Sequence, residues 1–236
     1  MNQEERLFDI QDKIKSATLT SGRKEGDVEL VAVSKTFPLE DILSFAHLGQ
    51  VDFGENKVQE FVHKANEHHE MGGTPPISWH LIGHLQRNKA KELVGRVHLF
   101  HALDSLRLAT ALNHHLEDAS QTLSCLIQVN VSGEESKFGM EPAELNQFMD
   151  SVLALPRLRV EGLMTLASPT ENPEEVRPQF ALLRTLSESV RDRLTFVSTP
   201  TLSMGMSSDF EVAIEEGATL VRVGSSLFGG RSYVSA

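Results

Sequence analysis

A lysine at the end of an apolar run is the first residue whose position suggests chemistry. Residues 30–33 are apolar, and Pro38 suits the first turn of a helix, so Lys35 falls where a buried strand should end. A buried ammonium group is costly to desolvate and is therefore neutral or partnered, and lysines of that kind form Schiff bases with aldehydes. The alternative is an ordinary lysine whose charged end reaches solvent beyond the strand.

Two loops near the end of the sequence have the composition of an anion-binding site. Residues 203–208 and 224–226 supply hydroxyl groups, and their small side chains let backbone N–H groups approach a ligand. The alternative is ordinary turn chemistry, because glycine and serine are common in loops. Arg222 lies in a run of aliphatic residues, where an unpartnered charge is costly. It is therefore either a functional group or one half of a structural ion pair.

Other catalytic and metal-binding patterns are weak. His80 and His84 have an i, i+4 spacing, but Gly83 and the surrounding strand pattern predict no helix, and no third and fourth ligand is evident. A zinc site at these two histidines is therefore not expected. The single cysteine, Cys125, lies in an apolar run and is expected in the core. The absence of a Gly-x-Ser-x-Gly motif also argues against a hydrolase.

The candidate residues lie at the boundaries of a regular alternation of strands and helices. The hydrophobic patterns predict strands at 28–34, 51–54, 77–82, 97–101, 123–131, 158–164, 201–203 and 220–223. They predict helices at 2–20, 38–49, 56–69, 86–94, 104–116, 142–153, 174–194 and 209–216. Asn56 and Asp104 are the expected N-caps of two of these helices, and residues 231–236 are expected to form a tail.

Strict alternation of strand and helix implies parallel strands joined by right-handed crossovers. Eight repeats in 236 residues predict an α/β fold, a single (β/α)8 TIM barrel with an additional N-terminal helix and one domain over residues 1–236. An open doubly wound sheet is the alternative, but residues 34–38 contain no glycine and so lack its usual fingerprint. In a barrel, chemistry occurs at the carboxyl ends of the strands, where Lys35 and both late loops fall.

The composition excludes several classes of function. The formal net charge is −11, and the only concentrated basic stretch, 87–91, is short, so nucleic acid is not an expected partner. No run approaches the roughly 20 apolar residues that cross a bilayer, so no membrane partner is expected either. The polar, acidic residues 1–6 do not have the character of a secretory signal. We therefore expect a cytoplasmic protein.

Taken together, these segments resemble a known family. The resemblance rests on residues 31–36, 53–56, 79–89, 162–165, 202–210 and 221–229. They are similar to pyridoxal 5′-phosphate (PLP) barrels of the alanine racemase fold type. Over nearly the full chain they resemble the pyridoxal phosphate homeostasis protein family, the YggS/PROSC group, and segments 80–89 and 203–209 are the most specific. Members of that family are described as regulators of cofactor supply, with no well-established turnover.

The resemblance implies PLP as the cofactor and roles for particular residues. Lys35 would carry the cofactor aldehyde as an internal aldimine. Ser203, Gly224 and Ser225 would hold the phosphate through hydroxyl and backbone donors. Arg222 would face the pyridine nitrogen. Because a guanidinium keeps its proton at neutral pH, that nitrogen would stay unprotonated and the ring would be a weaker electron sink.

The remaining implied cofactor-binding residues are Asn56 and Met204, which would line the ring. Phe37 departs from the family pattern, which often has a second basic residue at that place. If that residue helps to capture or pass on the cofactor, transfer is expected to differ in this chain. Lys137 offers a second amine in a loop, and we expect it to be solvated.

The implied function is intracellular PLP homeostasis by a non-catalytic carrier or regulator, with PLP-dependent apo-enzymes as candidate partners. A PLP-dependent amino-acid racemase or lyase is the alternative. Racemisation needs a base on each face of the cofactor, and in alanine racemases the second is a tyrosine from an extra domain of the partner subunit. This sequence contains only Tyr233 and no such domain, so we expect neither racemisation nor a racemase-type dimer, but a monomer.

A third possibility is a sugar-phosphate barrel enzyme that uses Lys35 as a Schiff-base lysine without any cofactor. Such an enzyme would also need an acid–base carboxylate near the lysine. Glu55 is the only evident candidate in the sequence.

Overall fold

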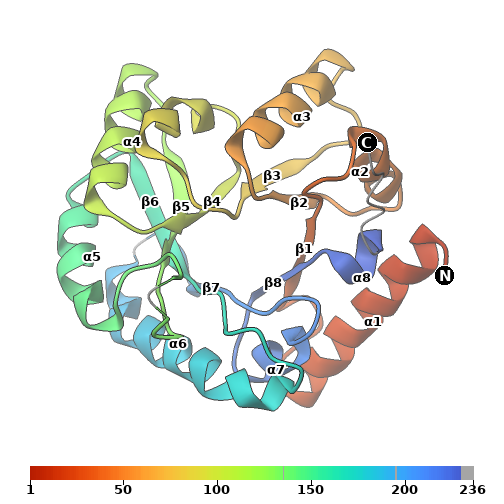
Figure 1. Cartoon of the computed structure of the whole chain (residues 1–236). Helices are drawn as coiled ribbons and strands as arrows, with labels where there is room; N and C mark the ends of the chain where they lie inside the picture. Colours follow the sequence, from red (N-terminus) through yellow and green to blue (C-terminus); the bar gives the residue numbers. More distant parts are fainter. Residues whose placement is uncertain (135, 195, 230–236) are drawn as a thin grey trace.

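Eight parallel strands close into a barrel in which each strand pairs with its neighbours in sequence, and β8 returns to pair with β1 (Figure 1). The structure is a computed structural model and describes residues 1–134, 136–194 and 196–229. The strands are β1 (Glu29–Val33), β2 (Asp52–Glu55), β3 (Ser78–Leu81), β4 (Leu99–Leu103), β5 (Leu123–Gln128), β6 (Leu158–Met164), β7 (Thr201–Ser203) and β8 (Leu220–Val223). The predicted (β/α)8 barrel is thereby confirmed.

Helices alternate with the strands and surround the barrel (Figure 1). The α-helices are α1 (Gln3–Thr20), α2 (Leu39–His47), α3 (Val58–Glu70), α4 (Leu106–Asp118), α5 (Leu145–Leu153), α6 (Arg177–Val190), α7 (Phe210–Glu215) and α8 (Ser225–Phe228). The 3₁₀ helices are η1 (Arg87–Leu93), η2 (Pro142–Glu144), η3 (Pro173–Val176) and η4 (Arg191–Arg193). The largest fully buried side chains include Phe45, Phe53, Phe61, Phe100 and Phe180.

The pairing of β1 with β8 brings the first and last predicted site segments together. Val31 pairs with Arg222, so the two strands end side by side. At Gly224, a Cβ would lie 3.1 Å from the carbonyl oxygen of Val33 and 3.2 Å from its Cβ, which is tighter than ordinary contact. Glycine at this position therefore permits the close approach of the two strand ends.

The additional N-terminal helix α1 is also confirmed, and it begins with a capping box. The Asn2 side chain accepts from the Glu5 N–H (2.8 Å), and the Glu5 carboxylate accepts from the Asn2 N–H (2.9 Å). The buried side of the helix, which includes Leu7 and Ile10, packs against α7 and α8. Among the residues that the structure describes, no helix is both long and apolar enough to cross a membrane.

Two predicted helix caps are wrong. Lys57 rather than Asn56 is the N-cap of α3, and Ser105 rather than Asp104 is the N-cap of α4. Asp104 instead bonds to the Nδ1 atom of His84 at 2.9 Å. A side chain that finds a tertiary partner is not available to cap its own helix, and the sequence does not reveal that partner.

Some element boundaries also differ from the prediction. β5 ends at Gln128, because Val129 forms an isolated bridge with Met140 and the Asn130 N–H bonds to the Met140 carbonyl. The helix predicted at 174–194 is α6, with short 3₁₀ turns before and after it. The sequence pattern does not predict the one-turn helix α8, and the predicted tail at 231–236 lies outside the described residues.

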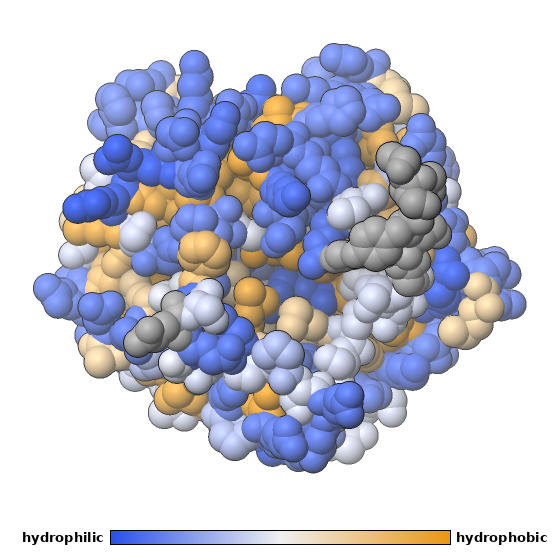
Figure 2. Space-filling view, viewed as in Figure 1, coloured by the Kyte–Doolittle hydropathy of each residue, from blue (hydrophilic) through white to orange (hydrophobic). Residues whose placement is uncertain are grey.

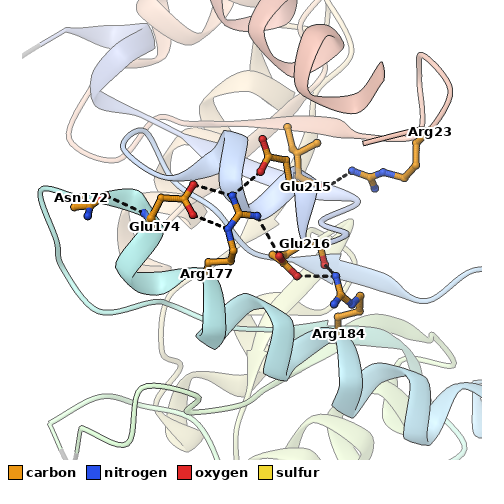
Figure 3. Close-up of polar contacts among 8 residues, drawn as sticks. Arg23, Asn172, Glu174, Arg177, Arg184, Glu215 and Glu216 are labelled. Carbon is orange, nitrogen blue, oxygen red and sulfur yellow. Dashed lines mark hydrogen bonds and ion pairs between the residues drawn. The ribbon is translucent and has the colours of Figure 1, made fainter. Parts of the chain in front are cut away.

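A network of ion pairs fastens α7 to α6 (Figure 3). Arg177 pairs with Glu174 (2.7 Å), Glu215 (2.6 Å) and Glu216 (3.1 Å), while Arg184 pairs with the second oxygen of Glu216 (2.6 Å). Exposed pairs are individually weak, but here one guanidinium serves three carboxylates. These contacts, led by Glu174, raise the pKa of Arg177. They hold the helix that directly follows the loop after β7.

Candidate functional site

A cavity of about 570 Å³ opens at the carboxyl ends of the strands, where barrels carry out chemistry. Five of the seven predicted site residues line it: Lys35, Asn56, Arg222, Gly224 and Ser225. Figure 2 shows a hollow near the centre of the molecule, with hydrophilic and hydrophobic residues around it. The fold thus gathers residues that are separated by most of the chain around one space.

Ser203 and Met204 are the two predicted site residues that do not line this cavity. Both are fully buried. Residues of the same loop take their place on the wall: Met206, Ser207 and Ser208. The signal that pointed to the loop was its small residues and hydroxyls, and it could not tell which of them faced inward. Gly205 makes the turn, with φ +91° and no room for a Cβ against Ala213.

A buried ion pair holds the strand end that carries Lys35. Lys64, on α3, is 5 % exposed, and its ammonium donates to the Ser34 carbonyl (3.0 Å) and pairs with Glu55 (2.7 Å). The Ser34 hydroxyl donates to the same Glu55 oxygen at 2.6 Å. Because β1 ends at Val33, these bonds anchor the chain just beyond the sheet.

The residue after Lys35 is held by the same cluster. Thr36 has a left-handed backbone (φ 72°), which is rare for a β-branched residue and costs about 1–3 kcal/mol. Its N–H donates to Glu60 (2.5 Å), whose carboxylate also pairs with Lys64 (2.7 Å). Both neighbours of Lys35 are therefore tied to one buried ammonium. Nothing in the sequence pattern indicates this role, because Glu60 and Lys64 have the spacing of an ordinary surface pair.

Glu55 has a structural place rather than a catalytic one. It is fully buried, and burial raises its pKa while Lys64 and Ser34 oppose that rise. It does not line the cavity, and its second carboxylate oxygen has no partner among the described residues. The sugar-phosphate alternative relied on Glu55 as the acid–base group beside Lys35. That alternative therefore loses its only candidate carboxylate.

Arg222 carries a buried charge that no carboxylate neutralises at close range. Its side chain donates to the Ser203 hydroxyl (2.5 Å) and to the Thr165 carbonyl (2.8 Å), and none of the described carboxylates lies within ion-pair distance. Burial lowers the pKa of Arg222 to about 10, with Asp209 opposing, so it remains protonated at pH 7. The structural ion pair considered for Arg222 is absent from the described part of the chain. A lone pair or an anion in the cavity would complement this charge.

A chain of hydrogen bonds runs from Arg222 through the barrel interior. Ser203 Oγ bonds to His101 Nδ1 (2.9 Å), His101 Nε2 bonds to His80 Nδ1 (2.9 Å), and His80 Nε2 bonds to Asp52 Oδ1 (3.0 Å). Burial, followed by the nearby His80 and Arg222, lowers the pKa of His101 well below its usual range, so its ring is neutral. Because a guanidinium can only donate, every atom is satisfied when each member donates to the next, ending at the carboxylate.

The structure describes two of three further residues that were named from the sequence. Phe37 lines the cavity and stacks on Phe228, with ring centroids 4.8 Å apart. The prediction that Lys137 is solvated is wrong, because its side chain is 19 % exposed, pairs with Glu134 (3.0 Å) and donates to the Ala167 carbonyl (2.9 Å). Tyr233 lies outside the described residues.

The (β/α)8 barrel thus has Lys35 directly after its first strand and the buried Arg222 on its eighth. The chain matches the family described as "Alanine racemase, N-terminal domain" over residues 10–232. It is 45 % identical to a pyridoxal phosphate homeostasis protein of Aquifex aeolicus, over 99 % of this chain and 100 % of that one. The chain therefore belongs to the pyridoxal phosphate homeostasis protein family.

Two further relatives agree with this assignment. The pyridoxal phosphate homeostasis protein of Escherichia coli K12 is 41 % identical over 96 % of each chain. Among solved structures, PipY of Synechococcus elongatus, determined with PLP bound, superposes with a TM-score of 0.83 at 32 % identity. That match covers 97 % of this chain and 100 % of PipY.

We expect Lys64→Met to lower the free energy of unfolding by about 3–5 kcal/mol, because it leaves the Glu55 carboxylate buried without a cation. Urea denaturation followed by circular dichroism measures the loss. The double variant Glu55→Gln/Lys64→Met should recover most of it, since a neutral amide can still accept from Ser34. Lys57, the exposed N-cap residue of the same helix, is the matched control, and Lys57→Met should change stability by less than about 0.5 kcal/mol. Equal stability of the two single variants would contradict the role given to Lys64.

Proposed function

We propose that this chain binds PLP, holds it as an internal aldimine on Lys35, and serves in intracellular PLP homeostasis as a carrier or regulator rather than as an enzyme. The observation that carries the proposal is the shared cavity. Lys35 and the buried guanidinium of Arg222, which has no carboxylate partner among the described residues, line the same cavity as a group of serine and glycine residues. Membership of the pyridoxal phosphate homeostasis family and the PLP-bound PipY structure support the same ligand.

The residues around the cavity fit the three functional groups of PLP. The aldehyde would react with Lys35, the pyridine nitrogen would accept from Arg222, and Asn56 would line the ring. We retain Gly224 and Ser225 as phosphate-binding residues. The cavity lining favours Ser207 and Ser208 over Ser203 as additional phosphate donors, because the Ser203 hydroxyl is already engaged by Arg222 and His101. Met204, buried behind the wall, would support the ring only through its neighbours.

The charge of Arg222 explains why such a site would bind the cofactor without efficient turnover. A guanidinium donates a hydrogen bond to the ring nitrogen but does not give up its proton, so that nitrogen stays unprotonated and the ring withdraws electrons less strongly than one that faces a carboxylate. This feature weighs against the racemase or lyase alternative.

The attachment itself is a condensation. The Lys35 amine adds to the PLP aldehyde, and loss of one water leaves a C=N bond, with no oxidation or reduction. We expect the loaded protein to absorb in the visible range of a protonated Schiff base and Lys35→Ala to lose this absorption entirely. Lys137→Ala is the matched control, since Lys137 is also a partly buried loop lysine but does not line the cavity. A coloured Lys35→Ala variant, or a colourless wild type in the presence of PLP, would contradict the proposal.

The proposal that the protein is not an enzyme makes a separate prediction. Loaded protein incubated with L-alanine and a panel of other L-amino acids should form neither D-isomers nor keto acids beyond the level of free PLP. Chiral chromatography and a keto-acid assay measure both products. Sustained, protein-dependent product that disappears in Lys35→Ala would establish the racemase or lyase alternative instead.

A carrier must also release its cargo to proteins that need it. We expect loaded wild-type protein to activate a purified PLP-dependent apo-enzyme faster than release of PLP into buffer would allow. Transfer is followed by the activity of the apo-enzyme and by loss of the carrier's visible absorption. Activation no faster than passive release would argue against direct delivery and would favour storage or sensing.

A further inference from the structure

A cluster of possible metal ligands lies at the end of the barrel opposite the cofactor cavity. Asp52 begins β2, His80 lies on β3, and His98 immediately precedes β4. One ligand atom from each of these residues lies within 4.8 Å of the others. The three come from neighbouring strands at the amino-terminal opening, and none of them lines the cavity that contains Lys35.

The donor set fits a divalent transition-metal ion. Two imidazoles and one carboxylate, with positions left for water, are typical ligands of Zn²⁺ and related ions. His80 Nε2 and Asp52 Oδ1 are 3.0 Å apart, while two ligands on one tetrahedral Zn²⁺ lie about 3.3 Å apart. His98 is exposed, so a rotation of its side chain can complete the set.

One ligand is held in place before any ion arrives. His80 is 2 % exposed, and its Nδ1 atom bonds to His101 Nε2 at 2.9 Å. Metal-binding histidines commonly use the second ring nitrogen in this way, because the bond fixes the orientation of the ring. Asp52 has the same effect on the other side of the ring, since it already bonds to the Nε2 atom that would face the ion.

The surroundings give an ion access to this cluster. His80 and His98 line a second cavity of about 570 Å³ that opens at this end of the barrel. Glu29 and Glu161 line it as well and add negative potential. Three arginines also line this cavity: Arg23 donates to the Ile214 and Ala218 carbonyls, Arg184 pairs with Glu216, and Arg191 is exposed to solvent.

We propose that Asp52, His80 and His98 bind a divalent transition-metal ion, with Zn²⁺ as the representative ion, and that the polar chain through the barrel connects this site to Arg222. The metal site is supported by the ligand chemistry of the three side chains and by the short distances between their ligand atoms. The connection to Arg222 is supported by the continuous hydrogen bonds through His101 and Ser203.

The connection follows from counting hydrogens. An ion on His80 Nε2 displaces the hydrogen there, so neutral His80 carries its hydrogen on Nδ1 and donates it to His101. Neutral His101 then carries its hydrogen on Nδ1 and donates to the Ser203 oxygen. The chain holds the same number of hydrogens as before, but its direction is reversed. The Ser203 hydroxyl hydrogen must turn to another acceptor, directly beside Arg222.

The metal site is tested on the unloaded chain with Co²⁺, which has intense visible absorption when tetrahedral, and with Zn²⁺ in competition. We expect Zn²⁺ to displace Co²⁺ from the wild type, and His98→Ala to weaken binding of both ions at least about 10-fold. His98 is exposed, so this variant should keep the fold, as circular dichroism checks. His63→Ala, another exposed histidine, is the control and should bind as the wild type does. Equal binding by wild type and His98→Ala would overturn the site.

The connection has its own readout, and this part rests on the proposed PLP binding. Saturating Zn²⁺ should shift the visible absorption of the loaded wild type and leave that of loaded His98→Ala unchanged. An unchanged wild-type spectrum with Zn²⁺ bound would overturn the connection while the metal site stands. If no PLP spectrum forms at all, the proposed function fails, and the Co²⁺ experiment on the unloaded chain still decides the metal site.

Discussion

The buried guanidinium of Arg222 is the constraint on which the barrel interior depends. A charge taken out of water without a carboxylate beside it must be met by oxygen acceptors, and the structure supplies a hydroxyl and a carbonyl. The hydroxyl belongs to Ser203, which in turn must be satisfied, and this need continues through two histidines to Asp52 at the far opening. The core of this barrel is thus polar along one line and apolar around it.

Two buried cations, Lys64 and Arg222, illustrate opposite solutions to burial. Lys64 is surrounded by two carboxylates and a carbonyl, so its charge is used to hold the turn that carries Lys35. Arg222 has no carboxylate at ion-pair distance among the described residues, so its charge is directed at the cavity. A fully paired cation positions the backbone, whereas an unpaired one is available to a ligand.

This arrangement accounts for a racemase-like barrel that is proposed to bind its cofactor without using it. The family model connects the chain to alanine racemase N-terminal domains, and the proposed pairing of Arg222 with the ring nitrogen would limit the chemistry that the ring can support. The same arginine lies at one end of the polar chain and the candidate metal ligands at the other. Hydrogen bonds between side chains thereby connect the two ends of the barrel.

The sequence by itself determined the order of strands and helices, and therefore the barrel, because each element has a strong hydrophobic period and the connections are short. It also pointed to Lys35 and Arg222, whose charges lie in or beside apolar runs. Only the tertiary structure decided which loop serines face the cavity, that Lys64 holds the turn that carries Lys35, and that Asp52, His80 and His98 meet. Those contacts join residues on different strands and helices. Their partners depend on the register and closure of the barrel, and local pattern contains no information about either.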